Sequence, residues 1–116
     1  MAFVQIGWIP YALERADNTC EFHSNWTRAK ETIPEPPSSY YWGRIFGCFT
    51  NDMFGMESIT AVGEDNVCFE TDYPHTDTTW PFAAQEAARM TASLTDAQRY
   101  KVMRGNALRM VDRADT

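Results

Sequence analysis

The segment that best combines side chains able to do chemistry is Glu70-Thr71-Asp72-Tyr73-Pro74-His75-Thr76-Asp77, which begins at the end of an apolar run. Asp72, His75 and Asp77 offer two carboxylates and an imidazole, which suit a divalent metal ion or general acid–base work. Ligands of parallel-sheet proteins gather at the carboxyl ends of strands, and Asp72 comes two residues after a predicted strand. The spacing is not specific by itself. A second interpretation, in which these polar residues only solvate a turn, therefore stays open.

A second candidate is Cys20-Glu21-Phe22-His23, which has a Cys-x-x-His spacing that zinc can use. A structural zinc ion needs four ligands, and no Cys-x-x-Cys or His-x-His pair exists to complete the set. We therefore expect a helix with a buried Cys20 and an exposed His23. Cys48 and Cys68 fall inside predicted strands, so we expect core thiols rather than nucleophiles.

The aromatic side chains fall into two groups. Trp8 and Trp80 lie in predicted loops between a strand and a helix, where lining a pocket and packing within the loop both stay open. Four phenylalanines are predicted to pack in the core: Phe46, Phe49, Phe54 and Phe69. The sequence has no glycine-rich phosphate loop and no nucleophile elbow, which gives nucleotide binding and acyl-serine chemistry little support.

The elements that would position these residues alternate between strands and helices. Short apolar runs predict three strands, at residues 2–6, 45–50 and 67–70. Apolar spacing and end signals predict helices beginning at Pro10 and covering 18–30, 53–62 and 81–90. Such alternation is typical of βα units around a parallel sheet, and Gly63 is predicted to end the third helix.

The last predicted helix begins at a capping box, Thr95-Asp96-Ala97-Gln98, in which Thr95 and Gln98 satisfy each other's free amides. It is predicted to continue with a core-facing stripe and to be interrupted at Gly105-Asn106. The stripe consists of Ala97, Tyr100, Met103 and Ala107.

The composition excludes several classes of protein. The 116 residues carry 10 Lys and Arg against 16 Asp and Glu, a formal net charge of −6. This surplus of acid disfavours a nucleic-acid or anionic-membrane partner. No stretch approaches the roughly 20 apolar residues that span a bilayer. With no signal peptide and three widely spaced cysteines, we expect a single cytoplasmic domain with reduced thiols.

Several segments together resemble one enzyme family. The run from Val62 to His75, Val-Gly-Glu-Asp-Asn-Val-Cys-Phe-Glu-Thr-Asp-Tyr-Pro-His, is similar to the last barrel strand of the amidohydrolase-related family. That family includes the aminocarboxymuconate-semialdehyde decarboxylase-like enzymes, and its signature there ends in Ser/Thr-Asp-Tyr-Pro-His. Three further pieces match in order: Gly7-Trp8-Ile9-Pro10-Tyr11 with Leu13-Glu14-Arg15, Pro37-Ser38-Ser39-Tyr40, and Asn106-Ala107-Leu108-Arg109.

The resemblance implies an α/β fold, a (β/α)8 TIM barrel of which residues 1–116 hold the C-terminal portion, the last three βα units. A full barrel takes about 250 residues, so the isolated chain is expected to be incomplete. In the family a divalent ion such as zinc or manganese is held by a His-x-His, by middle strands and by the aspartate that matches Asp72. Asp72 is thus implied to bind the metal or to take a proton from metal-bound water. His75 beside it would support that group or contact the substrate.

The sequence also departs from the family. It has no His-x-His, and Gln5 stands near the point where decarboxylase-like members place a histidine. These departures favour hydrolysis of an amide, ester or lactone carbonyl by metal-activated water over decarboxylation. One carboxylate and one imidazole are too few for a catalytic metal, so this chain alone is expected to bind metal weakly or not at all and to be inactive.

Other functions stay open beside the hydrolase. One is a non-hydrolytic decarboxylase of the same superfamily. Another is a non-catalytic α/β interaction fragment whose exposed strand edges drive self-association. A third alternative is a mis-started reading frame with no function of its own, because the chain opens inside a predicted strand. The expected partner is a small-molecule substrate, with no nucleic acid and no membrane.

Overall fold

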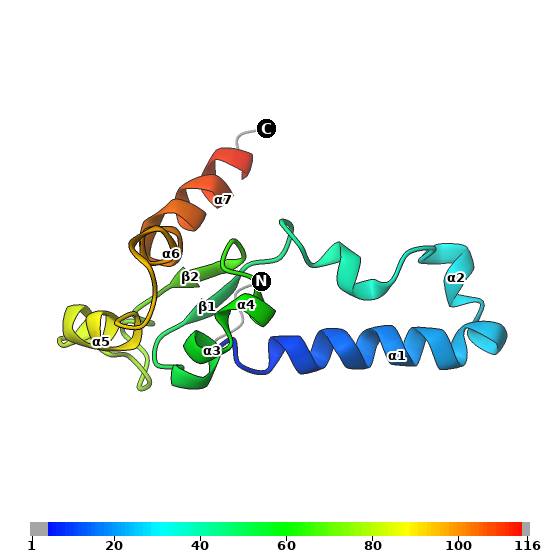
Figure 1. The fold of residues 1–116 in the computed structure, drawn as a ribbon, viewed down its shortest axis with the longest axis horizontal. Coiled ribbons are helices and arrows are strands. Elements are labelled where there is room, and N and C mark those ends of the chain that lie inside the picture. The colour runs from blue at the N-terminus through cyan, green and yellow to red at the C-terminus, as the bar shows by residue number, and fades with distance from the viewer. Residues whose placement is uncertain (1–4, 115–116) are drawn as a thin grey trace.

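The structure is a computed structural model that describes residues 5–114. A two-stranded parallel sheet lies at its centre, with helices at both ends of the molecule (Figure 1). The sheet pairs β1 (Gly47–Phe49) with β2 (Val67–Phe69), and Cys48 lies opposite Cys68. Parallel pairing of successive strands across a helical connection is the βα arrangement that the alternating pattern predicts.

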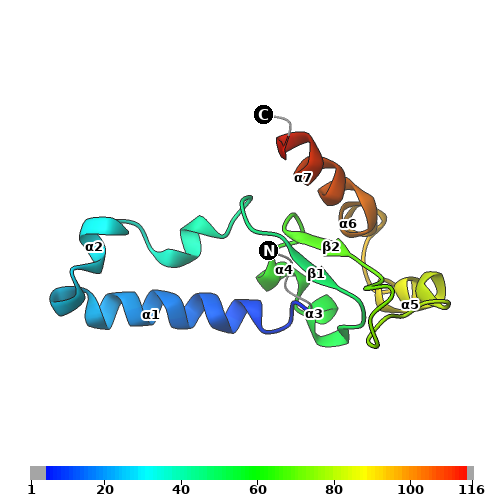
Figure 2. The ribbon, with the colours of Figure 1, turned by 180° about the vertical axis from the view of Figure 1, so that it is seen from behind.

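The helices surround this sheet unevenly. They are α1 (Ile9–Thr27), α2 (Ala29–Thr32), the 3₁₀ helix η1 (Pro37–Tyr40), α3 (Met53–Glu57), α4 (Ile59–Val62), α5 (Ala83–Met90), α6 (Asp96–Tyr100), the π-helix η2 (Lys101–Gly105) and α7 (Asn106–Ala114). Figures 1 and 2 show α1, α2 and η1 as an arm on one side of the sheet, with α5, α6 and α7 on the other. None of the helices in the described part of the chain is long and apolar enough to cross a membrane.

The N-terminal elements differ from the prediction. Residues 9–27 form one continuous helix, where the sequence pattern predicts two stretches, and it ends at Arg28, whose φ of 57° is left-handed. The predicted strand at 2–6 falls mostly on residues outside the described part. Gln5 and Ile6, which are described, lie in no strand.

The middle elements follow the prediction more closely. The strands are shorter than the apolar runs 45–50 and 67–70 that predict them, because the ladder pairs only Gly47–Phe49 with Val67–Phe69. The helix predicted at 53–62 is divided at Ser58, whose backbone leaves the helical region. Gly63 ends α4 as predicted, and its φ of 96° is a conformation that favours glycine.

The C-terminal helix confirms its start and corrects its core-facing side. Thr95 and Gln98 form the predicted capping box, with both reciprocal hydrogen bonds present. The predicted stripe is wrong, since Tyr100 is 57% exposed and Met103 is 36% exposed. The buried face of this helical segment carries Val102 and Asn106, four residues apart, while Ala97, Tyr100 and Met103 are exposed.

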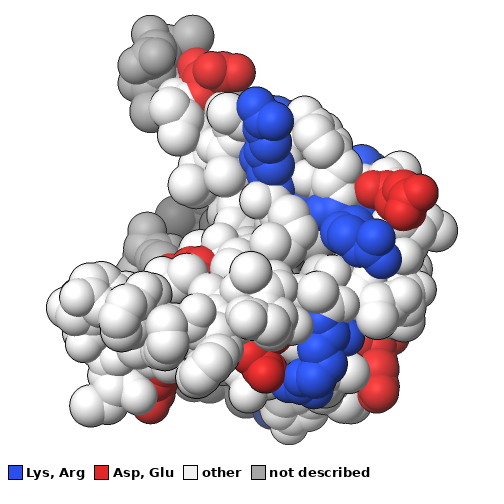
Figure 3. Space-filling model, turned by 90° about the vertical axis from the view of Figure 1, so that its left-hand side faces the viewer, with Lys and Arg blue, Asp and Glu red and all other residues white. Residues whose placement is uncertain are grey.

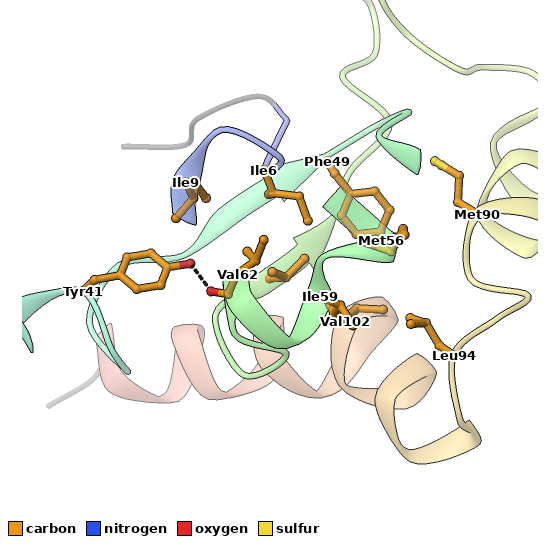
Figure 4. Packing of buried hydrophobic residues seen from close by; sticks show 11 residues of the cluster. Ile6, Ile9, Tyr41, Phe49, Met56, Ile59, Val62, Met90, Leu94 and Val102 are labelled. Atoms are coloured by element: carbon orange, nitrogen blue, oxygen red, sulfur yellow. Dashed lines mark hydrogen bonds between the residues drawn. The ribbon is translucent and has the colours of Figure 1, made fainter. Parts of the chain in front are cut away.

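One hydrophobic core joins the sheet to the helices around it (Figure 4). Its buried members are Ile6, Ile9, Tyr41, Phe49, Met56, Ile59, Val62, Val67, Met90, Leu94 and Val102. The Phe49 and Phe69 rings meet edge to face, with centroids 5.5 Å apart. Phe54, predicted to be core, is 64% exposed on α3. The hydroxyl of Tyr41 donates to the Val62 carbonyl at 2.9 Å, and burial raises its pKa to about 12.

Two buried asparagines join the sheet to its surroundings. The Asn66 amide donates to the Tyr41 and Ile45 carbonyls at 3.1 and 2.8 Å. The Asn106 amide donates to the Glu64 and Val67 carbonyls, both at 2.7 Å. Each amide finds two backbone carbonyl acceptors, as buried polar groups require. The turn before β2 is thereby held from both sides.

Ion pairs hold the C-terminal helices to the same turn. Lys101 contacts Glu64 at 2.7 Å and Asp65 at 3.1 Å. The hydrogen bond to Glu64, followed by that to Asp65, raises the pKa of Lys101, and the bond from Lys101 lowers the pKa of Glu64. Figure 3, which looks at this end of the molecule, shows basic side chains one after another with acidic ones beside several of them.

A single carboxylate connects the start of the chain to the end of β1. Asp52 Oδ2 accepts hydrogen bonds from the backbone N–H groups of Ile6 and Gly7, both at 2.7 Å. Its other oxygen accepts from the Gly55 N–H at 2.8 Å and caps α3. Hydrogen bonds to an ionised acceptor are the stronger kind. The segment before α1 is therefore fixed beside β1 although it forms no strand.

We expect Asp52→Ala to destabilise the chain by about 3 kcal/mol, because three backbone donors lose a charged acceptor. Urea unfolding followed by circular dichroism measures the change. The control is Asp96→Ala, whose side chain is fully exposed and bonds Arg99 at 3.5 Å; a change within about 0.5 kcal/mol is expected there. Equal effects of the two substitutions would contradict the role assigned to Asp52.

Candidate functional site

The carboxyl ends of β1 and β2 open onto a loop that carries the predicted site. The ladder continues one residue past β2, because the Glu70 N–H donates to the Phe49 carbonyl at 3.0 Å. The chain then enters the loop 71–81. The Thr78 hydroxyl donates to the Thr71 carbonyl at 2.6 Å and accepts from the Trp80 N–H at 3.1 Å. These bonds close the loop back onto the end of the strand.

The structure brings Asp72 and His75 together, as the site prediction requires. Asp72 Oδ1 lies 2.9 Å from His75 Nδ1, and the His75 N–H donates to the Asp72 carbonyl at 2.8 Å. An ionised carboxylate only accepts, so the contact places a proton on Nδ1 and leaves Nε2 at the other side of the ring. The Asp72 side chain is 18% exposed and that of His75 is 76% exposed.

The backbone at Asp72 is unusual for a residue with a side chain. Its φ of 55° lies in the left-handed region, which aspartate tolerates better than most residues. Strained backbone of this kind clusters at functional sites. Asp77, the third residue of the predicted site, is exposed, and no hydrogen bond or ion pair of the described residues joins it to Asp72 or His75.

Glu70 belongs to this edge of the sheet; it begins the predicted site segment, but the sequence analysis assigns it no role of its own. Strand side chains alternate between faces, so Phe49 and Phe69 point into the core while Cys68 and Glu70 point to the opposite face. Burial, followed by the negative charge of Asp72, raises the pKa of Glu70. The sequence did contain a signal for Glu70, namely a carboxylate at the end of an apolar strand, two residues before the candidate metal ligand Asp72.

Gln5 lies at the same edge, on the other side of β1. Its amide nitrogen donates to the Thr50 hydroxyl at 3.0 Å, and Thr50 follows directly after β1. The φ of Gln5 is 71°, so this residue shares the left-handed backbone of Asp72. Gln5, Thr50 and Glu70 thus come from neighbouring segments that end at one edge of the sheet.

The other predicted site residues lie elsewhere. Cys20 is half-buried and His23 is exposed on α1, where the His23 ring meets Trp26 edge to face at 5.4 Å. Within residues 5–114 no group of three or more His, Cys, Asp and Glu is placed so that it could hold a metal ion. Trp80 lies beside the Tyr73 ring at 5.4 Å, in the site loop. Trp8 helps to line an apolar hollow of about 130 Å³ at the start of β1. Because the strands are parallel, this is the end of the sheet opposite to the one that carries Asp72.

A comparison of sequences identifies the family of the chain. The model of a family described as Amidohydrolase matches residues 5–113. The chain belongs to the amidohydrolase family. No curated protein matches it. The family is consistent with a TIM-barrel-like α/β fold, and the two parallel strands with their helices are the part of such a fold that the described residues show.

The thiols of this amidohydrolase chain face the same side as Glu70 but are poor nucleophiles. Burial, followed by the negative charge of Glu70, raises the pKa of Cys48 to about 11. Burial likewise raises the pKa of Cys68. The thiolate is the reactive form, so neither cysteine is expected to act as a nucleophile. Cys68 is buried as predicted, whereas Cys48, predicted to be in the core, is half-buried.

Alkylation by iodoacetamide tests this assignment. With a pKa of about 11, about one Cys48 thiol in a thousand is ionised at pH 8. We expect its alkylation rate, followed by mass spectrometry in Cys20→Ser, to rise about tenfold per pH unit up to that pKa. In urea, where burial is lost, the same cysteine should react as fast as a free thiol. A rate that levels off near neutral pH in the folded chain would contradict the assignment.

Proposed function

We propose that this chain carries part of the active site of a metal-dependent hydrolase of the amidohydrolase type, in which metal-activated water attacks an amide, ester or lactone carbonyl. The observation that carries the proposal is the Asp72–His75 pair at the carboxyl end of β2, in a chain of this family. Superfamily members typically use divalent metals. Such an ion, when bound, lowers the pKa of its water and polarises the carbonyl.

Asp72 is the residue of this chain that would hold the ion. His75 holds one carboxylate oxygen, and the second oxygen accepts no hydrogen bond from the described residues. A carboxylate kept in one orientation by an imidazole is the kind of support that metal ligands require. The bonds from Thr78 fix the loop that follows, so the orientation of Asp72 is set before any ligand arrives.

The donor set fits part of a metal site and not the whole. Asp72 and His75 supply one carboxylate and one imidazole, whereas catalytic zinc sites use three protein ligands. We therefore propose that the remaining ligands come from further strands of a barrel, and that this chain alone binds zinc or manganese weakly. Whether the chain belongs to a hydrolytic branch of the family or to the decarboxylase-like branch is decided by the reaction that the complete site performs.

Substoichiometric Mn²⁺ tests the assignment even where binding is weak, because the paramagnetic ion broadens NMR signals near its site. We expect broadening at Asp72 and His75 in the wild type and its loss in Asp72→Asn. The control, Asp112→Asn on α7, should keep the broadening. Broadening confined to other acidic residues would contradict the proposal.

The same chain should retain no zinc or manganese through dialysis and should not hydrolyse a lactone or ester, since two donors are too few. Stoichiometric metal that survives dialysis, with turnover lost in Asp72→Asn, would show that the chain needs no further ligands. It would overturn the proposed incompleteness while supporting the hydrolase.

A second function, self-association, is favoured by large apolar side chains on two outer faces. On α1, Phe22 is 77% exposed and Trp26 is 72% exposed. On α7, Leu108 is 46% exposed and Val111 is 58% exposed. Exposed apolar faces of this kind mark interaction surfaces. We propose that copies of the chain associate through them.

Size-exclusion chromatography with light scattering tests association. We expect the wild type to form dimers or larger species, and Val111→Glu to shift the population towards monomer because a charge replaces an apolar contact. Thr60→Glu, at an exposed polar position on α4, should leave the distribution unchanged. A wild type that elutes as a monomer at every concentration would contradict association.

A further inference from the structure

Three buried side-chain atoms of the described residues have no hydrogen-bond partner: Gln5 Oε1, Glu70 Oε1 and Thr79 Oγ1. Buried polar atoms in folded proteins are almost always paired, because an unpaired one loses its water without compensation. Each exception therefore needs a physical reason. A ligand that supplies the missing partner is one such reason.

The three atoms belong to segments that meet at one edge of the sheet. Gln5 reaches this edge through its bond to Thr50, directly after β1. Glu70 reaches it through the ladder bond to Phe49. Thr79 follows Thr78, whose hydroxyl donates to the Thr71 carbonyl, two residues after β2. It is also the edge that carries Asp72.

Buried polar groups on the core side behave differently. Asn66 and Asn106 each donate to two backbone carbonyls, and the Thr91 hydroxyl donates to the Ala87 carbonyl at 2.8 Å. The chain thus satisfies its buried side chains where they serve packing. Where the strands end, the Gln5 amide nitrogen and the Thr50 hydroxyl are bonded to each other, but one buried oxygen each of the half-exposed Gln5, Glu70 and Thr79 has no partner.

The chemistry of the three atoms defines what they could bind. An amide oxygen and an ionised carboxylate oxygen are acceptors only, so Gln5 and Glu70 require donors from a ligand. The Thr79 hydroxyl can donate or accept. The matching ligand presents at least two O–H or N–H groups. Because Asp72 lies two residues from Glu70, these groups would lie close to the reacting end of the ligand.

We propose that Gln5, Glu70 and Thr79 bind the substrate directly, and that the substrate is a small carbonyl compound with hydroxyl or amine donors beside the reacting carbonyl. This rests on the proposed hydrolase function for the carbonyl. The donor recognition stands on the three unpaired atoms. A site that hydrogen-bonds such groups discriminates strongly against analogues that lack them.

Thermal unfolding of the free chain gives the first test. Thr79→Val removes a hydroxyl that has no partner, so the melting temperature should stay the same or rise. The control, Thr91→Val, removes a bonded buried hydroxyl and should lower the melting temperature by about 4 °C. A similar loss in both variants would overturn the proposal, because it would give the Thr79 hydroxyl a structural partner.

Binding of a named probe gives the second test. D-ribonolactone carries free hydroxyls beside its carbonyl, and its fully O-methylated form lacks them. Titration calorimetry with the wild-type chain, in the presence of a chelator, should show binding of the first and at least about tenfold weaker binding of the second. Glu70→Gln and Thr79→Val should weaken lactone binding about tenfold, while Thr79→Ser should preserve it.

The two proposals fail separately. If the wild type binds both lactones equally, or neither, donor recognition by these residues is overturned whatever the metal experiment shows. If the lactone binds as expected but Mn²⁺ leaves the Asp72 and His75 signals unchanged, the metal-dependent hydrolase is wrong and the donor site stands.

Discussion

The carboxylate of Asp52 is the interaction on which the candidate site depends. It accepts three backbone N–H groups, two from the segment before α1 and one from α3. That segment forms no strand, so these bonds replace the ladder that would otherwise hold it beside β1. With Ile6 and Gly7 fixed, Gln5 comes within hydrogen-bond distance of Thr50. One side chain thereby fixes the segment before α1 beside the end of β1, which the ladder pairs with β2.

The same arrangement bears on where backbone strain is found. Gln5 and Asp72 both have left-handed φ values, 71° and 55°, and they flank the same edge of the sheet. A non-glycine residue holds this conformation only when its surroundings determine it. The Asp52 bonds do so next to Gln5, and the two contacts with His75 do so at Asp72. Of the three non-glycine residues with left-handed φ in the described part of the chain, these two lie where the strands end, and the third, Arg28, ends α1.

Local patterns predicted the parts of the fold that local energetics decide. Two apolar runs gave the parallel strands, Gly63 the end of α4, and Thr95 with Gln98 the capping box. The core stripe failed because contacts with the turn before β2 and with β2 itself select the helical face that carries Val102 and Asn106, which residue spacing alone does not reveal. In the site, Asp72 and His75 were predictable because they are three residues apart in one turn. The placement of Gln5 depends on its hydrogen bond to Thr50, 45 residues away, which no short pattern encodes.

Buried polar atoms on the core side of the sheet differ from those at the carboxyl ends of its strands in whether they find hydrogen-bond partners. Towards the core, even a fully buried asparagine such as Asn106 finds two carbonyl partners, so the chain is able to satisfy buried amides. At the carboxyl ends of the strands, chemically similar groups on Gln5 and Glu70 go unpaired. Folding alone would favour apolar residues there, since an apolar side chain of the same shape avoids the loss of hydration. Polar atoms that cost stability at one edge, beside a carboxylate held by an imidazole, are what a protein retains when a ligand completes their hydrogen bonds.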